Sequence, residues 1–252
     1  MGLIILPAID LRGGSVVRLR QGDPAAQTLF DADPAAVALR WVEQGARWLH
    51  VVNLDGALTG SSDDTSGALP LNLRRLAEIR AQTDVPVQYG GGIRSLADIE
   101  RILSLGASRV LIGTAAVRHP DLVKQAVERF GPQSVVVALD ARNERISTDG
   151  WREQSSLTVT EVALQLAHLG VVRVLYTDIS RDGMLAGVNV DSTLGLARTS
   201  GLRVIASGGV AGLADIRALA ARCRDGIEGV VVGQALYTGA LDLRLALEAA
   251  SH

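Results

Sequence analysis

The stretch GGIRSLADI at residues 91–99 returns as GGVAGLADI at residues 208–216, with glycine, apolar and acidic positions in the same order. Each copy continues through a helix-like segment into an apolar run that ends in glycine. That run reads RVLIGTAAV at residues 109–117 and GVVVGQALY at residues 229–237. The chain therefore repeats one unit of turn, helix and strand in each of its halves.

Two further pairs of segments extend this repeat. LDGALTG at residues 54–60 matches RDGMLAG at residues 181–187, and LIILPAID at residues 3–10 matches SVVVALD at residues 134–140 more weakly. All pairs follow one another in the same order. The repeat period is far longer than that of a solenoid, which leaves two similar half-domains as the interpretation.

Short apolar runs alternate with longer amphipathic segments along the whole chain. Continuous apolar runs are typical of parallel strands buried on both faces. An open doubly wound sheet has the same local pattern, but the duplication favours a closed (β/α)8 TIM barrel, a fold of about 250 residues. We expect a single domain with half-barrels at about residues 1–130 and 131–252. The predicted strands are Leu3–Ile9, Trp48–Val52, Val85–Tyr89, Arg109–Ile112, Ser134–Leu139, Arg173–Thr177, Leu202–Ala206 and Gly229–Val232, and the clearest predicted helices are Asp33–Gln44, Leu71–Gln82, Leu96–Leu105, Thr158–Leu169 and Leu213–Arg222.

The overall composition excludes several classes of protein. The net charge is −2 with no block of basic residues, which argues against nucleic-acid binding. No run approaches the roughly 18 apolar residues of a membrane span, and the short apolar start lacks the basic region of a signal peptide. Cys223 is the single cysteine, so an internal disulfide and a cysteine-based zinc site are excluded. We expect a cytoplasmic protein with no membrane partner.

Glycine-rich segments follow four predicted strands and precede helices. Glycines at such positions let backbone N–H groups approach an oxyanion, and the next helix start adds a favourable dipole. The same glycines could instead only form tight turns. Four loops in two matched pairs favour phosphate binding, and the implied ligand carries a phosphate at each end.

Three aspartates lie where a barrel places its active site, at the carboxyl ends of the strands. Asp10 and Asp140 each end a predicted apolar strand, on opposite sides of the barrel mouth, and Asp182 follows the sixth strand. Any one of them could serve only to cap the next loop. Facing a phosphate-bounded cavity, a pair could instead act as general base and general acid. Asp55 and Asp178 are interpreted as structural.

The remaining polar and aromatic residues give weaker indications. The four histidines, His50, His119, His168 and His252, are scattered without the spacing of metal ligands, so no metal site is predicted. Trp151 follows Gly150 in a polar stretch. It is either an apolar anchor for its loop or a lid that stacks on a planar ligand ring.

Taken together, these segments resemble the HisA family, the phosphoribosyl isomerases of histidine biosynthesis, along essentially the whole chain. The resemblance implies the conversion of ProFAR to PRFAR by an Amadori rearrangement, without metal or organic cofactor, in a protein we expect to be a monomer. The segments that carry it are LPAIDLRGGSVVRLRQGD (6–23), GGGIR (90–94), IGTAAV (112–117), ALDAR (138–142), GW (150–151), YTDISRDGMLAG (176–187), IASGGV (205–210) and GVVVGQALY (229–237).

The resemblance also assigns roles to residues. It makes Asp10 the general base, leaves Asp140 or Asp182 as the general acid, and gives Thr177 an assisting role. Arg18, Gln21 and Trp151 look like residues that close over the substrate. One phosphate would be held by Gly91, Gly92, Gly113 and Thr114, and the other by Ser207, Gly208, Gly209, Gly233 and Gln234.

Three enzyme alternatives remain at this stage. A HisF-type cyclase shares the duplicated barrel, but its first strand typically has Cys before Leu-Asp, where this chain has Ala8-Ile9-Asp10. A dual-substrate isomerase of the PriA type, which also acts on phosphoribosyl anthranilate, is poorly separated by sequence. A flavin-binding barrel would leave the first-half phosphate site unexplained, and colourless purified protein would count against it. A non-catalytic phosphate-binding barrel would leave the aspartates unexplained.

Overall fold

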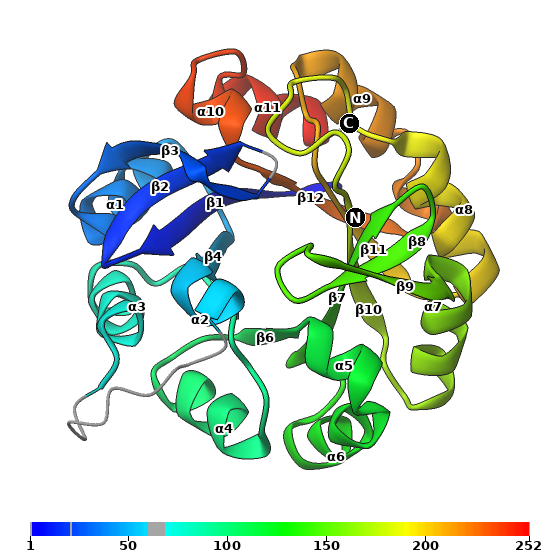
Figure 1. Ribbon diagram of the computed structural model, residues 1–252. Helices are drawn as coiled ribbons and strands as arrows, with labels where there is room; N and C mark the ends of the chain where they lie inside the picture. The colour runs from blue at the N-terminus through cyan, green and yellow to red at the C-terminus, as the bar shows by residue number, and fades with distance from the viewer. Residues whose placement is uncertain (1, 21, 60–68, 252) are drawn as a thin grey trace.

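The computed structural model describes residues 2–20, 22–59 and 69–251. Within these residues, eight parallel strands close into a barrel, because β10 pairs with β7 as well as with β11 (Figure 1). Around the barrel they are β1 (Ile4–Arg12), β4 (Leu49–Asn53), β5 (Val87–Gly90), β6 (Arg109–Ile112), β7 (Val135–Arg142), β10 (Arg173–Asp178), β11 (Arg203–Ser207) and β12 (Ile227–Val232). The predicted (β/α)8 barrel and its eight strands are confirmed.

Helices surround the barrel and connect successive strands (Figure 1). Three of the helices predicted from sequence begin at residues whose side chains cap them. Asp33 accepts hydrogen bonds from the N–H groups of the first turn, and Ser95 and Thr158 each form a capping box. The helices are α1 (Pro34–Glu43), α2 (Leu54–Thr59), α3 (Leu71–Gln82), α4 (Leu96–Ser104), α5 (Thr114–Arg118), α6 (Pro120–Phe130), α7 (Val159–His168), α8 (Val190–Ser200), α9 (Leu213–Ala220), the 3₁₀ helix η1 (Cys223–Asp225), α10 (Gln234–Tyr237) and α11 (Leu243–Ala250).

The prediction that Asp10 and Asp140 end their strands is wrong. Strand β1 continues to Arg12 because Asp10–Arg12 pair antiparallel with the start of β2 (Ser15–Arg20). Strand β7 continues to Arg142 because it pairs in the same way with β8 (Arg145–Thr148). Both aspartates therefore lie within hydrogen-bonded strands, which hold their backbone in place.

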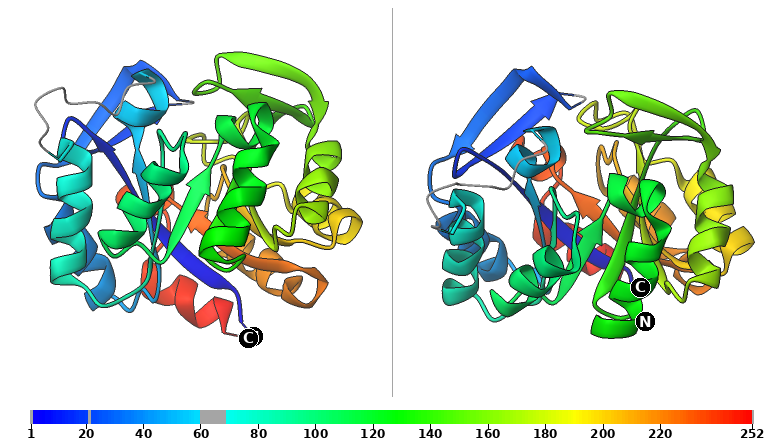
Figure 2. Two further views of the ribbon diagram at one scale, coloured as in Figure 1. Left: turned by 90° about the horizontal axis from the view of Figure 1, so that it is seen from below. Right: turned by 60° about the horizontal axis from the view of Figure 1, so that its bottom comes forward.

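Two hairpins that the sequence did not reveal rise from the barrel mouth. One is formed by β2 and β3 (Asp23–Asp31), and the other by β8 and β9 (Glu153–Thr158). Figure 2 shows both at the end of the barrel opposite the chain termini, on facing sides. They form a rim around the carboxyl ends of the strands.

The core has two layers, one on each face of the strands. A small cluster fills the barrel interior, and a larger one of Val, Ile, Leu and Ala lies between strands and helices. Branched aliphatic side chains suit both layers, which explains how the chain builds its core with few aromatic residues. The interior cluster consists of Leu6, Ala8, Leu111, Val136, Leu175, Ile205 and Val231.

An ionic group fills the amino-terminal end of the barrel. Glu228 pairs with both Arg173 and Arg109, and the Arg109 guanidinium lies 4.0 Å from the Trp48 ring centroid. Arg173 and Arg109 are both buried. Because these side chains close this end, the open mouth lies at the other end. No helix in the described ranges is long and apolar enough to cross a membrane.

Candidate active site

A cavity of about 410 Å³ occupies the barrel mouth at the carboxyl ends of the strands. Ligand sites of this fold lie at that end. Acidic side chains from β1, β7 and the loop after β10 line it, together with four glycine-containing turns. The cavity thus brings together residues that are far apart in the sequence.

Arg18, on β2, bridges two carboxylates in this cavity. Its Nη1 donates to Asp10 Oδ2 at 2.7 Å, and its Nη2 donates to Asp182 Oδ1 at 3.0 Å. Burial raises the pKa of Asp10, Arg18 lowers it in part, and Asp182 raises it further. Burial also opposes the charge of Arg18, but Asp182 and Asp10 outweigh it and raise the pKa of Arg18. A carboxylate with a raised pKa is a stronger base than free aspartate.

Asp140 faces the cavity from β7, on the opposite side of the barrel from β1. The indole Nε1 of Trp151 donates to Asp140 Oδ2 at 2.8 Å. Thr177 lies beside Asp140 in the pairing of β10 with β7. Burial raises the pKa of Asp140, hydrogen bonds from Trp151 and Thr177 lower it in part, and Asp182 raises it. Such an environment suits a carboxyl group that donates a proton.

Trp151 connects the two rim hairpins. Its backbone adopts φ of +70°, a conformation that residues other than glycine rarely adopt. A Cβ atom at Gly22 would lie 2.5 Å from Trp151 Cε3, so the ring packs directly against the backbone of the first hairpin. The indole therefore covers Asp140 and also contacts the hairpin on the opposite side of the barrel mouth.

The first glycine turn follows β5 and leans on the end of β4. Gly91 has φ of +101°, and a Cβ there would lie 2.1 Å from the carbonyl oxygen of Asn53. Gly92 packs against Gly56, where a Cβ would lie 2.9 Å from the Gly56 Cα. No side chain fits at either position, so backbone atoms line this part of the cavity.

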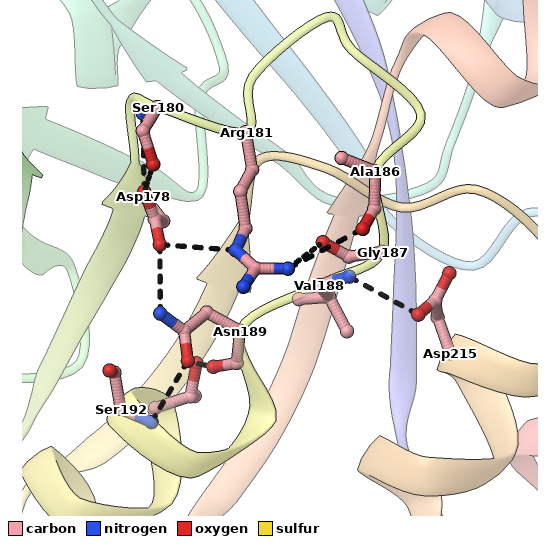
Figure 3. Close-up of polar contacts among 10 residues, drawn as sticks. Asp178, Ser180, Arg181, Ala186, Gly187, Val188, Asn189, Ser192 and Asp215 are labelled. Atoms are coloured by element: carbon pink, nitrogen blue, oxygen red, sulfur yellow. Dashed lines mark hydrogen bonds and ion pairs between the residues drawn. The ribbon is translucent and has the colours of Figure 1, made fainter.

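The second glycine turn follows β11 and leans on the end of β10 in the same way. A Cβ at Gly208 would lie 2.7 Å from the carbonyl oxygen of Asp178, and one at Gly209 would lie 2.4 Å from that of Gly187. The Asp178 side chain accepts hydrogen bonds from Ser180 and Asn189 (Figure 3). Asp178 thus fixes the loop beneath the turn.

The Asp178 loop is held at a second point. Arg181 donates to the carbonyl oxygens of Ala186 and Gly187, and the N–H of Val188 donates to Asp215 (Figure 3). These contacts close the loop on itself and against the start of α9. The backbone that supports Gly209 is therefore rigidly placed.

Two short helices complete the glycine turns. Gly113 precedes α5 with φ of −95° and ψ of −112°, and Gly233 precedes α10 with nearly the same angles, −109° and −94°. Free N–H groups at helix starts favour anions. The matched angles show that both halves present the same backbone frame to the cavity.

Every predicted site residue within the described ranges lines this cavity. Gln21 lies outside them. The structure does not assign chemical roles to the lining residues, and those roles stay predictions. The residues are Asp10, Arg18, Gly91, Gly92, Gly113, Thr114, Asp140, Trp151, Thr177, Asp182, Ser207, Gly208, Gly209, Gly233 and Gln234.

Over residues 4–242 the chain matches the model of the family described as "Histidine biosynthesis protein". The chain belongs to this family. Three relatives share almost half of its residues over nearly their whole lengths. They come from Moorella thermoacetica (47% identical, 99% of both chains), Rhizorhabdus wittichii (48%, 99% of both) and Zymomonas mobilis (49%, 97% of this chain and 94% of the relative). Each is named 1-(5-phosphoribosyl)-5-((5-phosphoribosylamino)methylideneamino)imidazole-4-carboxamide isomerase.

In this member of the histidine biosynthesis family, sequence reasoning missed some cavity residues. Arg118, at the end of α5, pairs with Asp149 and Glu153 of the second hairpin, and the Asp149 N–H donates to the Thr114 hydroxyl at 2.9 Å. These contacts tie the hairpin to the two ends of α5. They join positions 31 to 35 residues apart, and no local pattern signals them.

His50 was also missed. It lies on β4, is 6% exposed, and lines the cavity. Burial and then the charge of Arg18 lower the pKa of His50 to about 3. A histidine within an apolar strand gives no signal that separates it from a core histidine. Within the described residues, no group of three or more His, Cys, Asp or Glu side chains is arranged to hold a metal ion.

Proposed function

We propose that this chain catalyses the isomerisation of ProFAR to PRFAR in histidine biosynthesis, the reaction for which its relatives are named. One observation carries the proposal: two matched glycine turns lie across a single cavity, with carboxylates between them. This arrangement fits a substrate that has a phosphate at each end and a reacting sugar in the middle.

Backbone N–H groups hold the phosphates in the proposed complex. The first site uses Gly91, Gly92, Gly113 and Thr114, and the second uses Ser207, Gly208, Gly209, Gly233 and Gln234. Two fixed sites set the substrate's position before reaction, and such positioning can supply a large part of a rate enhancement. The sugar is thereby held over Asp10.

The proposed chemistry consists of proton transfers. A general acid protonates the ring oxygen of the aminoaldose, the bond from C1 to that oxygen breaks, and a protonated Schiff base forms between C1 and nitrogen. Asp10 then removes the proton from C2, which gives an enolamine. Proton return to C1 and loss of the O2 proton yield the aminoketose. No metal or organic cofactor takes part in this sequence.

The acid in this scheme is Asp140 or Asp182. Asp140 is favoured because burial raises its pKa, which keeps a proton on it at higher pH. Asp182 is bound to Arg18 and reaches the cavity from a loop. Thr177 assists beside Asp140, and Arg18, Gln21 and Trp151 close over the substrate.

We further propose that the chain acts as a cytoplasmic monomer and forms a single domain of two half-barrels, about residues 1–130 and 131–252. The bisphosphate substrate is its partner, and no nucleic acid or membrane is involved. The continuous barrel sheet, in which β6 of the first half pairs with β7 of the second, supports the single domain.

Steady-state kinetics on purified protein test the proposal. Turnover of ProFAR to PRFAR is expected without added metal, and it should persist in the presence of a chelator. Absence of turnover would contradict the proposed function. Phosphoribosyl anthranilate is the second substrate to assay, since turnover of both compounds would replace the single-substrate function with the dual one.

A further inference from the structure

Apolar side chains of the barrel interior form part of the floor of the active-site cavity. Ala8, Leu111, Leu175 and Val231 line the cavity and belong to the barrel interior cluster. His50 lines the cavity at the same depth, because it pairs with Ala8 in the register of β4 with β1. The imidazole of His50 therefore lies next to apolar side chains of the cavity floor.

Gln88 fixes which nitrogen of His50 carries a proton. Gln88 is fully buried on β5, directly opposite His50, and its Nε2 lies 2.8 Å from His50 Nδ1. The amide N–H donates, so Nδ1 accepts and the proton of the neutral imidazole resides on Nε2. The low pKa of His50 keeps the ring neutral throughout the range in which enzymes work. His50 is therefore a fixed, uncharged N–H donor.

Asp10 lies on the same side of β1 as Ala8, the residue that pairs with His50. Asp10 is two residues beyond Ala8 on β1, so both side chains point to the same side of the strand, about 6.6 Å apart along it. Arg18, which binds Asp10, is near enough to influence the titration of His50. A carbon held in front of Asp10 consequently has its hydroxyl within reach of the floor.

We propose that His50 is a catalytic residue that donates its Nε2–H hydrogen bond to the sugar hydroxyl at C2, the carbon that Asp10 deprotonates. This inference rests on the proposed isomerase function. The hydrogen bond withdraws electron density from C2, makes its proton more acidic, and persists as that oxygen becomes the ketone. His50 gives up no proton in the step. A neutral imidazole avoids transferring a proton to an oxygen that must finish as a carbonyl.

Gln88 is a positioning residue in this scheme. It touches His50 and acts by holding the tautomer. Its Oε1 is buried without a hydrogen-bond partner within the described part of the chain, a cost that a purely structural glutamine would not need. Retaining that unsatisfied atom is consistent with a requirement for the amide N–H at Nδ1.

The test compares His50→Leu with His50→Gln, whose amide nitrogen reaches the place of Nε2. Loss of a donor to the reacting oxygen is expected to lower kcat about 100-fold in His50→Leu with little change in KM, and His50→Gln should recover at least about tenfold of that loss. Substrate deuterated at C2 adds a second readout. The isotope effect on kcat should grow in His50→Leu, because only C2–H cleavage has slowed.

A third variant, Gln88→Met, checks the positioning. Nitrogen-15 spectra of the imidazole should report a protonated Nε2 in the unsubstituted protein and a mixture of tautomers in the variant. A kcat in His50→Leu equal to that of the unsubstituted protein would overturn the inference, as would equal losses in the Leu and Gln variants with an unchanged isotope effect. An unsubstituted protein without turnover would instead overturn the proposed function, so the two failures are distinguishable.

Discussion

The segments that follow β4 and β10 carry the same Asp-Gly pair, at Asp55-Gly56 in helix α2 and at Asp182-Gly183 in a loop. Each segment supports the glycine turn of the next strand. Asp55 accepts hydrogen bonds from the Gly13 N–H at 2.7 Å and from Asn72 at 2.8 Å, outside the cavity lining. Asp182 lies in the cavity and binds Arg18. The two halves therefore share a backbone frame but differ in whether the equivalent carboxylate lines the cavity.

The same contrast exists between Asp10 and Asp140, which occupy equivalent strands. Asp10 is bound by a guanidinium and Asp140 by an indole N–H. A charged and a neutral hydrogen-bond donor set different environments for two carboxyl groups, as an acid and a base require. Substituting one aspartate of each equivalent pair should show whether the two halves of the barrel differ in chemical role.

The largest effect is expected from Asp10→Asn. The amide cannot accept the C2 proton, so kcat should fall on the order of 1,000-fold while KM changes little. Because burial raises the pKa of Asp10, the unsubstituted enzyme should lose kcat/KM on acidification at a pH above the ordinary range of aspartate. Steady-state kinetics across pH measure both. Retained turnover in the variant would remove Asp10 as the base.

A somewhat smaller effect should separate Asp140 from Asp182. Asp140→Asn is expected to reduce kcat on the order of 100-fold or more, because it removes the proton donor that we favour in the proposed mechanism. Asp182→Asn should reduce kcat less and raise KM, because it releases Arg18. The same assay under identical conditions compares them. A larger loss of kcat in Asp182→Asn would make Asp182 the acid.

The glycine turns offer a direct comparison of stability between the halves. Gly91→Ala combines an unfavourable φ with a 2.1 Å approach to Asn53, and should lower the free energy of unfolding by about 3 kcal/mol. Gly208→Ala meets a looser contact of 2.7 Å and should cost less. Urea unfolding of both variants gives the difference. Equal losses of unfolding free energy in the two variants would mean that the backbone at Asn53 shifts to accommodate the added Cβ atom.

The smallest effect is expected from Asp55→Asn, the counterpart of Asp182→Asn. The amide oxygen can still accept one of the hydrogen bonds, so the free energy of unfolding should fall by about 1 kcal/mol. Its kcat should equal that of the unsubstituted protein, because Asp55 does not line the cavity. Thermal unfolding and kinetics on one preparation test this. A loss of kcat here would argue for a chemical role in both halves.

The sequence predicted the barrel well because its strands are continuous apolar runs and its helices start at recognisable caps such as Ser95 and Thr158. Both signals are local. The first hairpin was missed because β3 is exposed along most of its length and has neither a continuous apolar run nor a strict alternation of apolar and polar residues. It forms through pairing with β2 rather than through its own pattern. The repeat also predicted both glycine turns, because the matched segments at residues 91–99 and 208–216 are local sequence patterns as well.

Long-range electrostatics escaped prediction. The bridge from Arg18 to Asp182 spans 164 residues, and no spacing rule relates the two positions. His50 escaped because its environment comes from Gln88 and Ala8 on neighbouring strands. The sequence indicated which residues lie at the barrel mouth. Only the structure revealed the hydrogen-bond and ion-pair partners of those residues.

The first and last described segments of the chain lie side by side (Figure 2). The Leu3 N–H donates to the Ala250 carbonyl oxygen at 3.0 Å. A short linker could join them without moving any barrel strand. The segment between α6 and β7, from Gly131 to Ser134, lies between the two repeats and could serve as a new start. A circular permutant opened there would be translated with the second half first. The order of the two repeats in the gene would then be reversed, while every strand kept its neighbours in the barrel. A barrel built by duplication of one half would allow this rearrangement.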